Sequence, residues 1–419
     1  MAPSSTTPLA FVLHLPDTFR VSGEIISGHV EFDLARAQVD GIESVRVNLK
    51  GCIVTKVIEL NSDGSNTTHE RAIELLNSTK LLWERGTAFP DPDTHVLPLP
   101  FQFRLPDNLP PSFDLHVHHH EASISYAIEV LGTRPGCLRK NRQICKIFKV
   151  LPAASPAQIL AKRSLKQGWG GPWRTVFLEQ KIRQGVWGDY GHARVEAKVP
   201  DLTSFPCATA IPLQFCIQTR TKPMSCTDAP EDKSGRPLFP APPAQSADVK
   251  LFFHREANIR ALRRNGTAKD SFRIHGSLGD PASTSVKSDI QDAEWIPDPE
   301  KKDRGVWKRA VRFETTVSLP FAPTFSTETI ECKYSLRFTV CFPGIRNDLK
   351  IYVPIHLDPA HACRSPPGWS PQISYADIPP EDPEDLLEDM PPSYWEANNV
   401  RQSRSDMHHP NTGSNLTAE

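Results

Sequence analysis

The sequence predicts an all-β protein, made of two tandem antiparallel β-sandwiches followed by a disordered C-terminal tail. Three observations carry this prediction. Apolar and polar residues alternate over many short segments, and a period of two is typical of a strand with one buried face. The chain has 40 prolines, about twice average usage, and they lie in turns and in the tail. The stretch Leu97–Val130 is also repeated, in weaker form, at Leu319–Val340.

The stretch Leu97–Val130 is the segment around which the first sandwich is organised. Its first strand places Phe101 and Phe103 on one face and their polar neighbours on the other. The prolines of Pro106–Pro111 lack backbone donors, which excludes a helix or a central strand and predicts a turn. A returning strand then has four residues facing the core: Ile124, Tyr126, Ile128 and Val130. The residues between them should face away: Ser125, Ala127 and Glu129.

The weaker copy near the other end of the chain predicts a second domain of the same kind. Leu319–Phe325 repeats the proline-rich turn, and Tyr334–Val340 repeats the alternating strand that follows it. The offset is about 210 residues, which is the size of one all-β domain.

The order of strand, "LPDNLPPSF" turn and "ISYAIEV" strand resembles the N-terminal sandwich of the arrestin family. A second stretch, "SGEIISGHVEF" followed by "GIESVRVNLKG", also resembles that domain. In "GIESVRVNLKG", Val45, Val47 and Leu49 should face the core, while Arg46, Asn48 and Lys50 should face water. The resemblance implies two tandem immunoglobulin-like sandwiches over about Phe11–Leu357.

We expect the chain to be organised in five parts. Residues 1–10 form a disordered N-terminus, 11–154 the first sandwich, 155–172 a linker with a short helix, 173–358 the second sandwich with loop insertions, and 359–419 a disordered acidic tail. The linker carries a helix-start signal, with Ser155 as N-cap and Pro156 at the first helical position. Gly168–Gly171 is its flexible part, and together with Ser155–Leu165 it should let the two sandwiches pivot.

In the first sandwich, the sequence predicts strands at Phe11–Leu15 and Ile144–Val150 and a loop at Asn61–Thr68. Arg71–Arg85 fits either a strand or a short helix. Gly23 suits a tight turn, and Gly28 suits a close approach of another chain segment.

In the second sandwich, two segments rich in turn-forming residues predict exposed loops, Lys222–Ala247 and Gly276–Arg304. The alternating segments predict its strands at Ala193–Val199, Ala208–Gln218, Val249–His254, Arg309–Leu319, Tyr334–Val340 and Ile351–Leu357.

The cysteines indicate a reducing compartment. The chain has nine, an odd number, without a CxxC pair. Cys52, Cys145, Cys216, Cys332 and Cys341 lie in or beside apolar strands and should be buried free thiols. The first residues lack the pattern of a secretory signal, and no apolar run approaches the roughly 20 residues that span a bilayer. We therefore expect a cytoplasmic protein.

Several function classes have little support. A net charge of −1 argues against nucleic acid as a partner. No motif of a nucleophile, metal protease, phosphate loop or carboxylate pair is visible, so we expect no enzyme and no cofactor. The run His116–Glu121 could in principle bind zinc, but adjacent histidines on a turn rarely converge on one ion, and a solvated loop is favoured over a metal site.

Three groups of basic residues leave two interpretations open. They are Arg134–Lys149, then Lys162, Arg163 and Lys166, and finally Arg260, Arg263 and Arg264. They are either the solvated faces of strands or contacts for acidic cargo tails or an anionic membrane.

The tail holds the motif that indicates function: Pro391, Pro392, Ser393 and Tyr394. A PPxY segment favours the polyproline II conformation, so little entropy is lost when its prolines and tyrosine enter the groove of a WW domain. Pro366–Trp369 is similar but has tryptophan in place of tyrosine. The acidic surroundings, from Asp377 to Asp389, predict that the segment is disordered and accessible.

Together, the sandwiches and the PPxY tail resemble the alpha-arrestin branch of the family. The resemblance implies an adaptor that binds the cytosolic tails of membrane transporters or receptors and recruits a HECT-class ubiquitin ligase through its WW domains. It would act in the cytoplasm and transiently at the plasma membrane or endosomes, promoting cargo ubiquitination and endocytosis. The alternative is an arrestin-fold scaffold in vesicle trafficking or ambient-pH signalling, without a role for a ubiquitin ligase.

Overall fold

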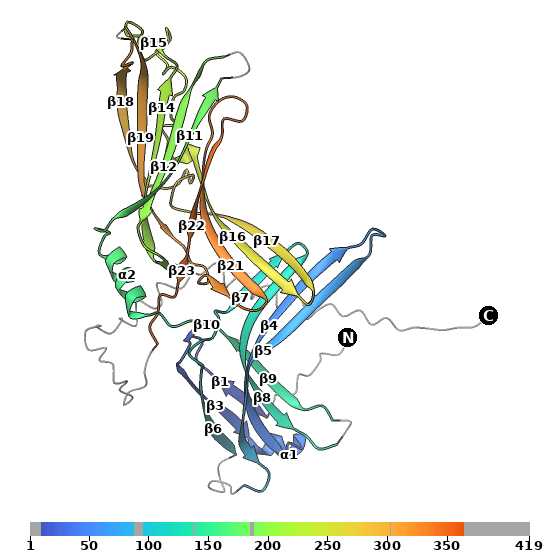
Figure 1. Ribbon diagram of the computed structural model, residues 1–419. Coiled ribbons are helices and arrows are strands. Elements are labelled where there is room, and N and C mark those ends of the chain that lie inside the picture. Colours follow the sequence, from blue (N-terminus) through green and yellow to red (C-terminus); the bar gives the residue numbers. More distant parts are fainter. Residues whose placement is uncertain (1–9, 88–94, 137–138, 185–187, 302, 364–419) are drawn as a thin grey trace, which may run out of the picture.

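The computed structural model describes residues 10–87, 95–136, 139–184, 188–301 and 303–363. These residues form two antiparallel β-sandwiches stacked end to end in an elongated body, which confirms the predicted all-β fold (Figure 1). The expected disorder at 1–10 and 359–419 mostly concerns residues outside this set, and the PPxY motif lies among them. It is wrong at the inner ends of both segments, because Ala10, Ala360 and His361 are buried against the body. Within the described part, no helix has the length and apolar character needed to cross a membrane.

The first sandwich consists of two facing sheets. One sheet has the order β1 (Phe11–His14), β3 (Ile25–Asp33) and β6 (Val96–Arg104). The other has the order β5 (Asn66–Glu84), β4 (Ser44–Leu60), β8 (His120–Thr133) and β7 (Phe113–Val117), and β9 (Arg142–Phe148) also pairs with β8. A short parallel pair, β2 (Arg20–Val21) with β10 (Val150–Leu151), and the helix α1 (Leu34–Asp40) complete it.

The second sandwich repeats this plan of two facing sheets and a short parallel pair. Its larger sheet has the order β11 (Trp173–Arg183), β12 (Tyr190–Pro200), β14 (Ala210–Thr221), β19 (Arg304–Ser318) and β15 (Met224–Ser225), with β18 (Lys287–Pro297) also on β19. The facing sheet has the order β17 (Arg264–Arg273), β16 (Val249–Ala261), β21 (Ile330–Val340) and β20 (Phe325–Ser326), with β22 (Leu349–Ile355) also on β21. The parallel pair is β13 (Phe205–Pro206) with β23 (Leu357–Asp358), and a 3-10 turn, Ser246–Asp248, precedes β16.

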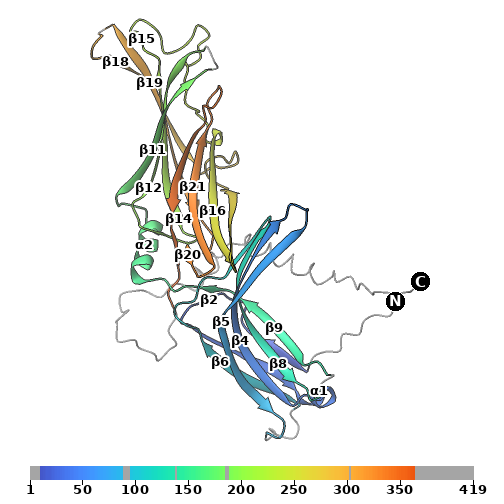
Figure 2. The ribbon, with the colours of Figure 1, turned by 45° about the vertical axis from the view of Figure 1, so that its right-hand side comes forward.

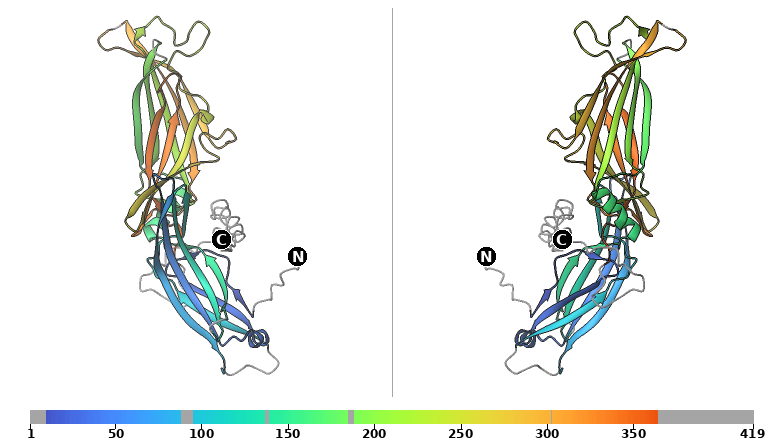
Figure 3. Two further views of the ribbon diagram at one scale, coloured as in Figure 1. Left: turned by 90° about the vertical axis from the view of Figure 1, so that its right-hand side faces the viewer. Right: turned by 90° about the vertical axis from the view of Figure 1, so that its left-hand side faces the viewer.

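Helix α2 (Pro156–Lys166) connects the two sandwiches and begins where the sequence predicts. Ser155 accepts a hydrogen bond from the backbone of Gln158, whose side chain in turn accepts one from the backbone of Ser155, so that both form a capping box. Beside the junction, the long hairpin β4–β5 and the hairpin β16–β17 approach each other from the two sandwiches (Figures 1 and 2). Figure 3 shows the same stacking from both sides.

The core contains the residues that alternation assigned to it. Phe101, Phe103 and Tyr126 are all buried, and Tyr126 donates a hydrogen bond of 2.7 Å from its hydroxyl to the carbonyl oxygen of Pro110. The turn residue Gly23 has a φ of 86°, in the left-handed region that favours glycine.

The expected close approach at Gly28 is also confirmed. A Cβ atom there would lie 2.7 Å from the carbonyl oxygen of His14 and 2.8 Å from the ring of Phe101. A side chain would therefore push β3 away from the strand and the ring on either side.

Two polar residues that were expected to face water are buried instead. Asn48 is 8% exposed and Glu129 is 7% exposed. Asn48 donates a hydrogen bond of 2.8 Å to Glu129 and accepts one of 2.9 Å from Thr79. Lys50 forms an ion pair of 2.5 Å with Glu129. Alternation assigned these residues to the outer face correctly, but neighbouring side chains cover that face, and their hydrogen bonds compensate the burial.

Several strand and loop assignments are corrected. Arg71–Arg85 lies in strand β5 apart from its last residue, and the loop expected at Asn61–Thr68 is shorter because β5 begins at Asn66. The largest error is Gly276–Arg304, where β18 lies inside the expected loop and pairs with β19. Lys222–Ala247 is largely irregular but contains β15.

Strands β11 and β17 were also missed. The free edge of β11 lies beside β22. Asn347, which shortly precedes β22 in the sequence, forms two hydrogen bonds with the backbone of Arg183 at the end of β11. The polar, turn-like composition of β17 and β18 did not predict strands. These segments become strands through pairing with a neighbouring strand.

The eight described cysteines are free thiols, and Cys137 lies outside the described residues. Cys332 is buried as expected, and Cys52 and Cys216 are half-buried. The expected burial is wrong for Cys145 and Cys341, which are exposed. Both lie on or next to the outer faces of strands. Successive residues of a strand point to opposite faces, so a shift of one position moves a side chain from the core to solvent.

We expect that aspartate at Tyr126 or at Leu336 unfolds the sandwich concerned, because both side chains are completely buried and the new charge would have no partner. The loss should be roughly 3–5 kcal/mol in the free energy of unfolding. Tyr126→Phe is the matched control, since it removes only the hydroxyl hydrogen bond and should cost about 1 kcal/mol. Chemical denaturation measures all three, and an unchanged stability for either aspartate variant would refute the assigned faces.

The buried carboxylate of Glu129 should make stability depend on pH. Burial acts to raise its pKa, but hydrogen bonds from Lys50 and Asn48 outweigh burial, so that the pKa is lowered from its ordinary value. A lowered pKa contributes stability above the unfolded-state value of about 4.3, and that stability is lost as the pH falls through the folded-state value.

Glu129→Gln should therefore lose about 1–2 kcal/mol at neutral pH, and its difference from the wild type should shrink below about pH 4. Denaturation curves from pH 3 to 7 test this. Glu331→Gln is the matched control, because the pKa of Glu331 is also lowered, by hydrogen bonds from Lys333 and Asn258, on an exposed strand face. An equal pH dependence in Glu129→Gln and wild type would contradict the role of this carboxylate.

Candidate functional site: a cationic face on the second sandwich

The outward face of the sheet β17–β16–β21–β22 carries a row of cationic and aromatic side chains. Strand register places Arg273 beside Phe252, Phe252 beside Arg337, and Arg337 beside Tyr352. The guanidinium of Arg337 lies over the ring of Phe252, 5.0 Å from its centroid, in a cation–π contact. Tyr352 ends the row and is 53% exposed. These residues come from four different strands, so only the folded sheet brings them together.

A second row of the same face adds two lysines. Lys250 lies beside Thr339, and Thr339 lies beside Lys350 on the next strand. Both lysines are exposed. We call the surface formed by Lys250, Arg273, Arg337, Lys350, Phe252 and Tyr352 the cationic face.

The acidic residues of this sheet lie nearer to the first sandwich and already have partners. Glu256 forms an ion pair of 2.9 Å with Lys269, and Glu331 forms one of 2.6 Å with Lys333. The four cations of the cationic face, by contrast, form no ion pair with any described residue. The sheet is thus divided into a neutralised half and a half with excess positive charge.

Two carboxylates lie near the rim of the cationic face. Asp280 is close enough to Arg273 for its pKa to respond, but its oxygens already accept two backbone hydrogen bonds, which are the main cause of its lowered pKa. Burial raises the pKa of the Cys341 thiol; the nearby Asp348 adds to this increase, and Lys250 opposes it. Neither carboxylate lies within ion-pair distance of the face's cations, so both leave room for an external anion.

His254 adjoins the face without adding charge at neutral pH. Its Nδ1 atom lies 2.8 Å from the hydroxyl of Ser271. Burial, assisted by the charge of Arg337, lowers its pKa below the ordinary value. The positive charge of the face therefore rests on arginine and lysine and is constant over physiological pH.

The chemistry of the cationic face fits an acidic polypeptide. Guanidinium groups donate two hydrogen bonds to a carboxylate in bidentate geometry, and lysines add positive charge at the rim. The exposed ring of Tyr352 and the half-buried ring of Phe252 offer apolar contact between the charges. The side chains form a surface layer with no nucleophile or paired acid and base among them, so the arrangement supports binding.

The sequence-predicted motif residues Pro391, Pro392, Ser393 and Tyr394 lie outside the described residues. The last described residues return to the first sandwich, where the backbone N–H of Ala154 donates a hydrogen bond of 2.8 Å to the carbonyl oxygen of His361. The segment that carries the motif therefore follows directly from the junction between the sandwiches.

The histidine-rich segment forms the end of the hairpin β7–β8. His118 has a φ of 47°, as a turn position requires, and His116 lies 3.5 Å from Glu121 across the hairpin. Throughout the described ranges, no three His, Cys, Asp or Glu side chains are grouped closely enough to hold a metal ion.

The predicted basic groups are largely engaged within the chain. Arg142 forms an ion pair of 2.9 Å with Asp40, and Arg264 forms one of 3.2 Å with Glu59. Lys162, which was expected to be exposed, is buried and donates a hydrogen bond of 3.2 Å to the carbonyl oxygen of Ala360. Linear clusters of basic residues thus did not identify the surface with excess charge.

The fold and this surface define a class of protein: a binding module of two stacked sandwiches with a further segment that starts at their junction. Residues 10–155 match the family model of the N-terminal domain of arrestin (or S-antigen). The first sandwich is therefore an arrestin N-terminal domain. The comparison with curated proteins gives no match.

We expect the cationic face to bind acidic peptides. Arg337→Glu combined with Lys350→Glu should weaken binding of a glutamate-rich peptide at least about tenfold, because both variants replace attraction by repulsion. The matched control is Lys269→Glu with Lys333→Glu on the neutralised half, which should change the affinity less. Fluorescence titration at low and high salt measures this, and equal losses in the two double variants would contradict a specific site.

Proposed function

We propose that the chain is an alpha-arrestin-like adaptor. In this proposal the sandwiches bind the acidic cytosolic tail of a membrane transporter or receptor, and the PPxY motif recruits a HECT-class ubiquitin ligase. Ubiquitination and endocytosis of the cargo are the result. The arrestin N-terminal domain at residues 10–155 supports an adaptor in trafficking or signalling. The sequence Pro391–Tyr394 is the single observation that carries the finer proposal.

The mechanism needs only binding. The cationic face holds cargo through charge, and the PPxY segment holds the ligase through a WW domain. Tethering raises the effective concentration of cargo lysines at the ligase, so the transfer becomes effectively intramolecular. The adaptor would act in the cytoplasm and be recruited transiently to the plasma membrane or endosomes by its cargo, with peripheral contact to anionic lipid as an additional attraction.

Tyr394→Ala should remove most of the affinity for WW domains, because the tyrosine fills a pocket that alanine leaves empty. Pro392→Ala should weaken binding through loss of ring contact and of the polyproline II bias. Trp369→Ala is the matched control and should matter little. The measurement is titration of the Met390–Asn399 peptide, and then of the full chain, against WW domains of HECT-class ligases.

Cargo ubiquitination in cells decides between the two functions. Loss of ubiquitination with Tyr394→Ala, at unchanged protein abundance, supports the adaptor. Equal ubiquitination by wild type and Tyr394→Ala refutes ligase recruitment and leaves an arrestin-fold scaffold in trafficking or ambient-pH signalling.

A further inference from the structure

The interface between the two sandwiches joins corresponding parts of each. Phe113 of β7 and Phe325 of β20 contact each other edge to face, with ring centroids 5.0 Å apart. Phe113 lies opposite the residue two positions before Tyr126, and Phe325 lies opposite the residue two positions before Tyr334. Since Tyr126 and Tyr334 are matching positions of the repeat, the two phenylalanines match as well. A contact between matching residues lies on a two-fold axis.

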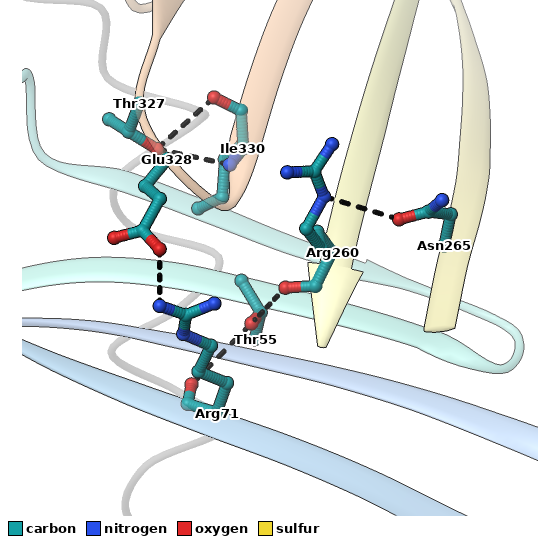
Figure 4. Close-up of polar contacts among 7 residues, drawn as sticks. All are labelled: Thr55, Arg71, Arg260, Asn265, Thr327, Glu328 and Ile330. Carbon is teal, nitrogen blue, oxygen red and sulfur yellow. Dashed lines mark hydrogen bonds and ion pairs between the residues drawn. The ribbon is translucent and has the colours of Figure 1, made fainter. Parts of the chain in front are cut away.

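The contacts on either side of the aromatic pair match in the same way. His120 and Glu328 each lie six positions before the repeat tyrosine of their sandwich. Glu328 forms an ion pair with Arg71 of the first sandwich, as Figure 4 shows. The ring of His120 packs against Gly266 of the second sandwich, where an added Cβ would lie 2.1 Å from it.

Arg71 and Gly266 are themselves matching positions, as the register shows. The repeat tyrosines pair with Gly51 on β4 and with Arg255 on β16. Four positions further along each strand, Thr55 lies opposite Arg71 and Ile259 lies opposite Gly266. The Arg71–Glu328 and Gly266–His120 contacts are therefore two copies of one contact, related by the same axis.

The hairpins β4–β5 and β16–β17 also contact each other in the interface. Thr55 is fully buried, and its hydroxyl donates a hydrogen bond of 2.9 Å to the carbonyl oxygen of Arg260 (Figure 4). Next to it, Arg264 and Glu59 form an ion pair of 3.2 Å between the hairpin ends. These contacts involve neither the linker nor helix α2.

One residue breaks the symmetry. Arg255 occupies the position that Gly51 occupies in the first sandwich, and its side chain is 6% exposed. It donates a hydrogen bond of 3.1 Å to Asp270 of its own sandwich and one of 3.3 Å to the carbonyl oxygen of Asp114 in the other. Its guanidinium also lies 5.4 Å from the ring centroid of Phe113. The second sandwich thus reaches into the first, and the reverse contact does not occur.

We propose that this pseudo-two-fold interface is a lock, which holds the two sandwiches in one orientation independently of the linker. Contacts on the axis and on both flanks have to break together for the sandwiches to turn, because a rotation that relieves one flank compresses the other. The body is then a single rigid unit, and the distance from the cationic face to the start of the motif-bearing segment is fixed. This replaces the expectation that the sandwiches pivot at Gly168–Gly171.

A substitution at Gly266 tests the lock without touching either core. Gly266→Leu places a side chain where the ring of His120 lies, so it should separate the flank while β17 keeps its pairing. The readout is single-molecule energy transfer in the full chain between dyes at Ile147→Cys and Tyr352→Cys, with the exposed native cysteines replaced by serine. Both label positions are more than half exposed, at 54% and 53%, and lie on different sandwiches.

We expect one narrow transfer peak for the wild type and a broadened, shifted distribution for Gly266→Leu. Adding His120→Ala should restore the narrow peak, because the removed ring leaves space for leucine. Arg71→Glu is an independent test on the other flank, and it should broaden the peak because it breaks the ion pair with Glu328. The charge-swapped double variant, Arg71→Glu with Glu328→Arg, should restore the narrow peak. Lys269→Glu is the control on the same strand as Gly266: its side chain pairs with Glu256 of its own sandwich and makes none of the contacts described above, so the peak should stay unchanged.

Two results would overturn the lock. A broad distribution in the wild type would show that the linker alone sets the orientation. Narrow peaks for both Gly266→Leu and Arg71→Glu, or an equal broadening by Lys269→Glu, would show that these contacts do not hold the sandwiches together.

Discussion

The antiparallel pairing of β4 with β8, and of β16 with β21, is the constraint on which the rest of the structure depends. In the first sandwich it places Gly51 under Tyr126, where a Cβ would lie 2.8 Å from the ring. A slip of one residue would turn every inward side chain of the strand toward solvent. The register therefore fixes both cores and also which residues of different strands become neighbours on the outer faces.

The same constraint produces surfaces of different character. On the first sandwich, the outer face buries Asn48 and Glu129 in a satisfied hydrogen-bond network that binds its own sheet together. On the second, the acids lie toward the junction and pair with lysines, so that Arg337 and Lys350 remain without ion pairs among the described residues. One face thus stabilises the fold, and the other carries the excess positive charge on which the proposed binding of an acidic partner depends.

The junction connects these surfaces with the proposed ligase contact. Phe113 and Phe325 meet where the repeats face each other, and the last described residues return to Ala154 beside helix α2. The proposed adaptor has to hold two bound proteins in a productive relation, and the proposed lock would keep the cationic face at one distance from the end of the described chain at the junction. In that proposal, the interface and the motif together set the effective concentration of one partner at the other.

The sequence by itself determined the fold class, the inward residues from Phe101 to Val130, the N-cap at Ser155 and the PPxY motif, because period-two alternation, proline and capping residues act locally. Only the tertiary structure decided that the polar segment Lys287–Pro297 is a strand, that Glu129 is buried, and that Arg273, Phe252, Arg337 and Tyr352 form one row. Each of these depends on which strands become neighbours. That choice is made by packing between segments far apart in the chain, and no local pattern contains it.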